Sequence, residues 1–312
     1  MTLEPSIELP VGGDAASAIA GWHARPAPTA FTGANAFSID VEDYFQVAAF
    51  FGVIDREDWD GYDCRVEANV DRILALLAEA DARATFFTLG WIAERYPGVV
   101  RAIVGMGHEL ASHGWDHRHA DRQTRAEFLA DVARTKALLE DQGGCEVKGY
   151  RAPHFSISRN NLWAMATLAE VGYSYSSSTH PVLHDSYGIP EGPRFAFYPL
   201  PGCNFMEIPV TTVRLFRRNW PCSGGGYFRL LPYEISARAL ARVNREGSPC
   251  VFYLHPWEID PGQPRISTAP LKSRARHYLN LKKTETRLVR LLQAFRWERM
   301  DKIFFPPAAL AS

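Results

Sequence analysis

The chain is predicted to be an α/β protein whose strands form a distorted, TIM-like (β/α)7 barrel, with a loop-rich insertion and a C-terminal helix. Short apolar runs suited to buried strands alternate with helical patterns, which implies a parallel sheet because parallel neighbours need crossover connections. Acidic and basic residues follow several of these runs. A barrel collects such residues at the carboxyl ends of its strands, whereas an open sheet gathers them at one switch point. The predicted strands span 36–41, 84–89, 109–112, 147–151, 173–177, 206–210 and 250–255.

Apolar residues at helical spacing predict the helices between these strands. Gly172 is the expected C-terminal cap of one helix, and Thr284 the expected N-terminal cap of the last. The helical patterns cover 66–77, 97–104, 128–139, 162–168 and 284–295.

The chain divides into three parts on this reading. Residues 1–35 are rich in Ala, Gly, Pro and Thr without periodicity, so we expect a flexible leader or a strap over the surface. The barrel occupies 36–260, and residues 261–312 form a C-terminal extension that packs on it. Within the barrel, 177–232 is rich in proline and aromatic residues, which indicates a long loop that lines a cleft.

Composition excludes several classes of protein. The 312 residues are 46% hydrophobic with a net charge of −1, which fits a globular protein and gives no electrostatic case for nucleic acid or an anionic membrane. Lys and Arg are denser at 272–276 and 282–283, and we interpret these runs as solvated surface rather than a site for a polyanion.

Cysteine usage and hydropathy bear on compartment. The five cysteines are odd in number and lack C-x-x-C spacing, which argues against a disulfide framework and a cysteine zinc site. No apolar run reaches the length of a membrane span, and no basic region followed by an apolar stretch marks a signal peptide. We therefore expect a cytoplasmic protein, with association with the cell envelope as the alternative.

Two histidines follow the third predicted strand. His113 and His117 lie four residues apart in a loop with Gly114, where both imidazoles can reach one divalent metal ion. With ten histidines in the chain, such a pair can also arise by chance. Its position at a strand end favours a metal site.

An acidic cluster ends the first predicted strand. Burying a carboxylate is costly unless it is paired or bound to a cation. Strand alternation puts Asp40 and Glu42 on one face, so the carboxylate ligand of the metal stays open between Glu42 and Asp43. Capping of a helix or loop is the structural alternative for these acids.

Two further charged residues follow strands 147–151 and 250–255. Arg151 can hold a neighbouring carboxylate ionised and aimed, although an ordinary structural salt bridge explains it equally well. His255 can supply a proton. A metal, a carboxylate base and a histidine acid are the parts of a metal-assisted hydrolase.

These motifs resemble those of the NodB-homology polysaccharide deacetylases, carbohydrate esterase family 4. The resemblance covers about residues 36–260 and is similar in detail to the branch found with exosortase-linked exopolysaccharide loci and to the peptidoglycan-deacetylase and allantoinase-like group. The matching segments are Ser38 to Asp43, Ala84 to Gly90, Ser112 to His117, Arg151 to Pro153 and Leu254-His255.

The resemblance implies a metal-dependent enzyme that removes N-acetyl groups from the sugars of a bacterial exopolysaccharide or cell-wall glycan. Asp40 is the expected base, Arg151 its partner and His255 the acid. Zinc is the expected ion, with cobalt or nickel as alternatives, on His113, His117 and either Glu42 or Asp43. Contacts to the polysaccharide substrate are expected from Pro153, Phe155 and Trp257.

Some positions depart from the family pattern. His154 stands where an aromatic residue is usual, and the acid that orients the catalytic histidine has no counterpart in 173–178. Glu258 and Asp185 are the candidates for orienting His255. Two other functions remain as alternatives: hydrolysis of a small cyclic amide, as in the allantoinase-like relatives, and non-catalytic polysaccharide binding by an inactive barrel.

Overall fold

A curled parallel sheet dominates the computed structural model, which describes residues 15–184 and 187–306. The strand order is β10-β1-β2-β3-β4-β5-β6, and β9 pairs with the other edge of β1. The strands are β1 (Ala34–Val41), β2 (Thr85–Thr88), β3 (Glu109–Ser112), β4 (Gly149–Tyr150), β5 (Tyr175–Ser176), β6 (Met206–Glu207), β9 (Val251–Leu254) and β10 (Arg296–Glu298).

All seven predicted strands are present, and the predicted fold class is confirmed. The sheet curls into a partial barrel, which is open between β6 and β9 because the described residues there form no regular ladder. Thr211 bridges this seam: its N–H donates to the carbonyl of Val251 at 3.3 Å, and the Val251 N–H donates to its Oγ1 at 2.6 Å.

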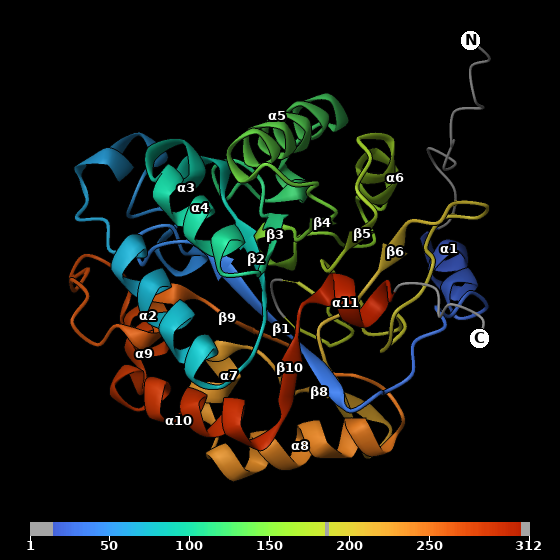
Figure 1. Ribbon diagram of the computed structural model, residues 1–312. Coiled ribbons are helices and arrows are strands. Elements are labelled where there is room, and N and C mark those ends of the chain that lie inside the picture. The colour runs from blue at the N-terminus through green and yellow to red at the C-terminus, as the bar shows by residue number, and fades with distance from the viewer. Residues whose placement is uncertain (1–14, 185–186, 307–312) are drawn as a thin grey trace.

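Helices surround the curled sheet on its outer side (Figure 1). The predicted helices are confirmed as α2 (Val66–Glu79), α4 (Pro97–Gly105), α5 (Arg125–Gly143), α6 (Trp163–Glu170) and α10 (Leu281–Ala294). The others are α1 (Ala15–Trp22), α3 (Gly90–Arg95), α7 (Gly225–Leu230), α8 (Tyr233–Arg245), α9 (Leu271–Tyr278) and α11 (Met300–Phe304).

The two predicted helix caps have different outcomes. Gly172 has a φ of 91° directly after the C-terminal cap of α6, as a left-handed terminus requires. The prediction that Thr284 caps the N-terminus of the last predicted helix is wrong. Helix α10 begins one turn earlier, after Asn280, and the Thr284 hydroxyl donates to the Asn280 carbonyl from inside the helix. Short polar side chains form such local bonds both at caps and within helices, so sequence alone misplaces the boundary.

The N-terminal segment contains structure that its composition does not signal. Residues 1–14 of the expected leader lie outside the described residues. Helix α1 is Ala-rich and too short for a visible period, yet its Trp22 is buried against Phe197 with ring centroids 4.9 Å apart. This part of the segment is therefore packed on the molecule, as a strap would be.

Two elements of the sheet region were not predicted. Strand β10 pairs with Ala34–Ala36 at the start of β1. It lies on the same edge of β1 as β2, which pairs with the later residues of that strand. Strands β7 (Thr212–Leu215) and β8 (Arg218–Pro221) form a hairpin inside the loop-rich segment. Its turn residues, Phe216 and Arg217, have φ values of 49° and 63°. Turns of this kind usually carry Gly or Asn, so the sequence signal is missing.

One end of the barrel is closed. At the amino ends of the strands, Thr85 and Tyr175 both donate hydrogen bonds to buried Glu109. Helix α11 packs against this end, where the Met300 N–H donates to the Thr85 hydroxyl at 2.8 Å. The carboxyl ends of the strands therefore carry the cavity.

Other sequence expectations can be checked directly. The five cysteines are free, as their spacing indicates. In the described part of the chain, no helix combines the length and the apolar character that crossing a bilayer requires.

Candidate active site

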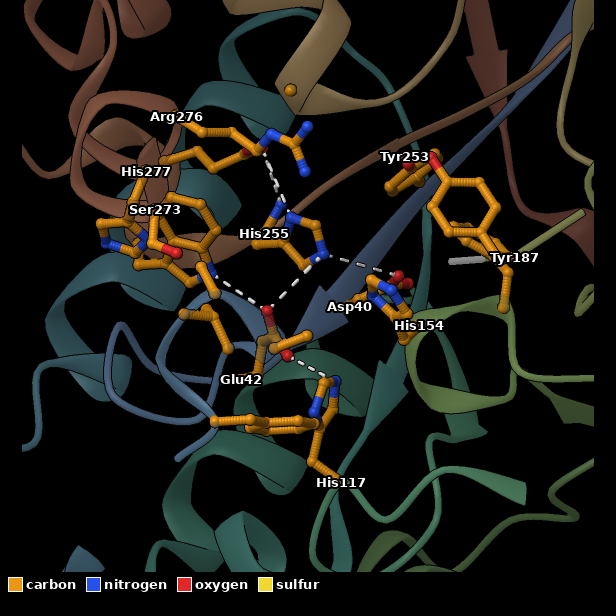
Figure 2. Close-up of a pocket in the computed structure, with 18 of the residues that line it drawn as sticks. Asp40, Glu42, His117, His154, Tyr187, Tyr253, His255, Ser273, Arg276 and His277 are labelled. Atoms are coloured by element: carbon orange, nitrogen blue, oxygen red, sulfur yellow. Dashed lines mark hydrogen bonds and ion pairs between the residues drawn. The ribbon is translucent and has the colours of Figure 1, made fainter. Parts of the chain in front are cut away.

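A cavity of about 780 Å³ opens at the carboxyl ends of the strands. Asp40 and Glu42 enter it from the end of β1, His117 from the loop after β3, and His255 from the end of β9 (Figure 2). Residues far apart in the sequence thus meet because parallel strands end on the same side of a barrel.

Glu42, His113 and His117 form the cluster that can hold a metal ion. One ligand atom from each lies within 4.8 Å of the others, and all three side chains are buried. The loop after β3 turns back at Gly114 and His117, with φ values of 75° and 58°, and brings the second imidazole over the first. His117 Nε2 lies 2.7 Å from Glu42 Oε2 (Figure 2).

The protonation and bonding of this cluster fit a cation. His113 Nδ1 donates to the Arg151 carbonyl at 2.8 Å, which leaves the Nε2 lone pair free to coordinate. Glu42 Oε2 is buried, and its near polar neighbour is the imidazole of His117. Burial lowers the pKa of His113 to about 4, so its ring is neutral. Two imidazoles and one carboxylate with open positions are typical of catalytic zinc.

The electrostatics of Glu42 also favour its ionised form. Burial opposes ionisation, but the neighbouring His117 and His255 outweigh it and hold the pKa of Glu42 well below its usual range. A carboxylate that stays charged when buried needs positive partners, which a cation here would supply.

Asp43 does not belong to this cluster, so its place among the metal-ligand candidates is corrected. Its carboxylate accepts hydrogen bonds from the backbone N–H groups of Tyr44, at 2.7 Å, and Arg65, at 2.5 Å. Arg65 is the residue from which α2 starts, so Asp43 anchors the entry to that helix. The capping alternative thus holds for Asp43 and fails for Glu42.

Arg151 holds Asp40 as predicted. Its Nη1 lies 2.5 Å from Asp40 Oδ1, and the whole arginine side chain is buried. Ser38 and Ser177 accept the remaining guanidinium hydrogen bonds at 2.9–3.1 Å. Because the other guanidinium contacts fix the arginine, this pair holds the Asp40 carboxylate in one orientation.

His255 faces the carboxylates from the opposite side of the pocket. Its Nε2 lies 3.9 Å from Asp40 Oδ2 and 3.6 Å from Glu42 Oε1 (Figure 2). Burial acts to lower the pKa of His255, but the surrounding carboxylates raise it to about 9.

Of the two candidates for orienting His255, Glu258 lies beside it, and the backbone N–H of His255 donates to its Oε2 at 3.3 Å. Its Oε2 lies 3.5 Å from His255 Nδ1, and its Oε1 accepts from Arg229 at 3.2 Å. Asp185, the other candidate, lies outside the described residues. In the sequence, this contact is indicated by Glu258 following His255 by three residues, in the turn after β9.

Trp257 has a role that the sequence did not suggest. Its indole Nε1 donates to Glu42 Oε1 at 3.1 Å, and its ring stacks on His255 and His277, with centroids 5.4 and 4.2 Å away. The side chain lines the pocket but is only 5% exposed. Trp257 therefore mainly holds the Glu42 carboxylate in place, because little of its ring is accessible to a substrate.

The two other expected substrate contacts differ from each other. Phe155 lines the cavity, whereas Pro153 is buried and does not, which corrects that expectation. Pro153 begins a short 3₁₀ turn (Pro153–Phe155) in which His154 has a φ of 57° and enters the cavity wall. The histidine that replaces the usual aromatic residue is therefore the least buried member of this turn.

Residues from the later part of the chain, in a loop and in helices α7 and α9, complete the wall. Tyr187, Tyr227, Ser273 and Arg276 line the cavity beside His277. None lies in a motif or directly at a strand end. Only the aromatic richness of 177–232 pointed to any of them.

The fold and the clustered residues define an α/β barrel with a metal-type hydrolase site. A polysaccharide deacetylase family model matches residues 59–175, and a model described as a domain of unknown function, DUF3473, matches 177–305. The first of these matches supports the resemblance of this part of the chain to the NodB-homology polysaccharide deacetylases, carbohydrate esterase family 4. The deacetylase match contains His113, His117 and Arg151, and the DUF3473 match contains His255.

Curated relatives match over part of their length. A peptidoglycan-N-acetylglucosamine deacetylase of Bacillus cereus is 28% identical over 37% of this chain and 46% of its own. A peptidoglycan deacetylase of Helicobacter pylori is 28% identical over 39% of each chain. A chitin deacetylase of Amylomyces rouxii is 29% identical over 35% of this chain and 25% of its own. The chain thus spans less than half the length of these relatives.

Similarity of fold extends further. A solved structure of a candidate polysaccharide deacetylase from Mycobacterium smegmatis aligns with 90% of this chain and 93% of its own. The TM-score is 0.55 at 17% identity. The shared feature is the barrel.

Proposed function

We propose that the protein is a metal-dependent hydrolase that removes N-acetyl groups from N-acetylated sugars of a bacterial exopolysaccharide or cell-wall glycan. The observation that carries the proposal is the cluster of Glu42, His113 and His117 directly beside the Asp40–Arg151 pair and His255. The relatives named above act on peptidoglycan and chitin, and both names point to polymers of N-acetylated sugars.

Zinc is the ion we propose for this cluster. When bound, such a cation polarises the acetamide carbonyl and lowers the pKa of a water molecule toward about 7. His113 and His117 would hold it through Nε2 atoms and Glu42 through its carboxylate. Trp257 keeps that carboxylate in place by its hydrogen bond.

Asp40 acts as the general base in this proposal. Its Oδ1 is committed to Arg151, and its Oδ2 faces the open pocket on the side of His255. Oδ2 accepts a proton from the water that attacks the acetamide carbon. The guanidinium holds the Asp40 carboxylate in place and prevents it from rotating away.

His255 acts as the general acid. Its raised pKa keeps the imidazole protonated at neutral pH, and its Nε2 faces the pocket while Glu258 fixes Nδ1. It donates its proton to the nitrogen as the carbon–nitrogen bond breaks. Acetate and a free amino sugar are the products.

Acetate release from N-acetylglucosamine oligomers, measured with and without a chelator, tests this function. We expect release that the chelator abolishes and that zinc or cobalt restores. Peptidoglycan fragments and exopolysaccharide in the same panel rank the polymers. Release that persists in metal-free protein, or hydrolysis of a small cyclic amide without acetate release, would contradict the proposal.

A further inference from the structure

Helix α9 forms one wall of the cavity. Its sequence, LKSRARHY, is the first of the basic runs that we interpreted as solvated surface. Four of its residues line the pocket: Ser273, Ala275, Arg276 and His277. Figure 2 shows Ser273, Arg276 and His277 on one side of His255 and His154 and Tyr187 on the other. The structure thus turns part of that basic run toward the substrate.

Arg276 and Arg122 are the arginines at the mouth of this pocket. Both are exposed and line the cavity, and neither forms an ion pair with any carboxylate of the described residues. Arg276 interacts electrostatically with His154 and Tyr187, and Arg122 with His119. The rings of His119 and His154 stack 5.0 Å apart, so each arginine interacts with one imidazole of the same pair.

The acidic groups of the same pocket are engaged elsewhere. Asp40 pairs with Arg151, Glu42 contacts His117, and Glu258 pairs with Arg229. These groups lie on the buried floor. Among the residues that the structure describes, no carboxylate pairs with the two arginines at the mouth of the pocket.

The size of the cavity leaves room for a second sugar. A volume of about 780 Å³ lies in the upper part of the range for pockets that enclose a drug-sized ligand, about 300–1,000 Å³. An acetamido sugar over the metal cluster would leave space toward α9. Guanidinium groups match the geometry of carboxylates, so an acidic neighbour fits that space.

We propose that Arg276 and Arg122 bind an anionic group on a sugar next to the acetamido sugar, so that the preferred substrate is an acidic polysaccharide with uronic acid residues. The inference rests on the proposed function for the acetamido sugar itself. It adds a specificity site whose charge complements the substrate.

A matched pair of substrates isolates the charge. Hyaluronan oligosaccharides alternate N-acetylglucosamine with glucuronic acid, and reduction of their carboxyl groups to alcohols leaves every linkage unchanged. The ratio of kcat/KM for acetate release from the acidic and the reduced form is the readout. We expect the wild type to prefer the acidic form about tenfold, the effect of one charged hydrogen-bonded contact.

Variants of single residues then show which side chains cause the preference for the acidic oligosaccharide. Arg276→Gln is expected to remove most of that ratio, and Arg122→Gln a smaller part. Lys272→Gln is the control, because Lys272 is an exposed cation on the same helix that does not line the pocket. Its variant should keep the wild-type ratio. Raised salt should weaken the preference, since the arginines are exposed.

Binding and neutral substrates separate the two proposals. Calorimetry with Asp40→Asn protein compares the affinities for the acidic and reduced oligosaccharides without turnover. Acetate release from chitin oligomers with no acidic preference would overturn this inference and leave the proposed function standing. An acidic preference in binding without acetate release from any substrate would support the inference and contradict the function. Equal affinities, no binding of either form, or an equal loss of preference in Lys272→Gln overturn the inference.

Discussion

The floor and the α9 wall of the pocket are built on different principles. The floor consists of buried side chains at strand ends, such as Asp40 and His113, each already held by a second group of the protein. The wall presents Arg276, which is exposed and forms no ion pair with the carboxylates of residues 15–184 and 187–306.

This difference indicates that the floor of the pocket carries out the reaction and that the α9 wall selects the substrate. Groups that move protons or hold a metal must be in place before substrate arrives, and burial with satisfied hydrogen bonds fixes them there. Groups that select a substrate can stay hydrated until it binds. The floor should therefore respond to substitution in metal content and kcat, and the wall in substrate preference.

His113→Ala is expected to have the largest effect on the floor of the pocket. We expect loss of the bound metal and acetate release reduced to background, because one of two imidazole ligands disappears. Folding should persist, since the lost hydrogen bond to the Arg151 carbonyl contributes only about 1 kcal/mol. Metal analysis, kinetics and thermal unfolding measure the three effects. Full metal content in this variant would mean that the cluster is not the metal site.

His255→Ala removes the acid but no ligand. The expected fall in kcat is about 10²–10⁴-fold, the usual contribution of a positioned acid or base. Metal content should match the wild type. If the variant loses the metal as well, His255 belongs to the coordination sphere and its assignment as the acid fails.

Trp257→Phe removes a hydrogen bond that holds the proposed metal ligand Glu42. The ring that stacks between His255 and His277 is kept, while the hydrogen bond to Glu42 is lost. Loss of such an outer partner should weaken metal affinity about 10–100-fold, as measured by competition with a chromogenic chelator. Trp220→Phe is the matched control, because Trp220 is 51% exposed on the β7–β8 hairpin. The same loss in both variants would exclude a specific role for the indole N–H.

Glu258→Gln is expected to change the pH dependence of the activity. In metal-free protein the His255 imidazole should titrate near pH 9 in NMR spectra, because burial is outweighed by Glu42, Glu258 and Asp40. Removing the Glu258 charge lowers that pKa. The acid is active only when protonated, so activity falls as pH rises through this pKa. The alkaline limb of the variant must therefore shift to lower pH; an unchanged limb would refute the coupling.

Sequence patterns recovered the barrel and most of its floor. Short apolar runs identify buried strands, and parallel strands place their carboxyl ends together, so Asp40, His113 and Arg151 could be grouped without coordinates. The motifs carry this information because each functional group directly follows its strand.

The remaining features depend on tertiary contacts. Strand β10 has three residues and gains its pairing only from β1. Glu42 and Asp43 are chemically alike, and their roles separate only because the start of α2 comes close enough to bind Asp43. Arg276 lies far from every motif, and no local pattern distinguishes it from its solvated neighbour Arg274.

Metal content of purified Glu42→Gln and Asp43→Asn proteins, measured side by side by plasma mass spectrometry, tests the central claim most directly. Both substitutions remove one negative charge from the same acidic cluster. The account predicts that Asp43→Asn keeps the wild-type stoichiometry of one ion per chain, while Glu42→Gln retains almost none. Equal metal content in the two variants, or loss in Asp43→Asn alone, would contradict the site described above.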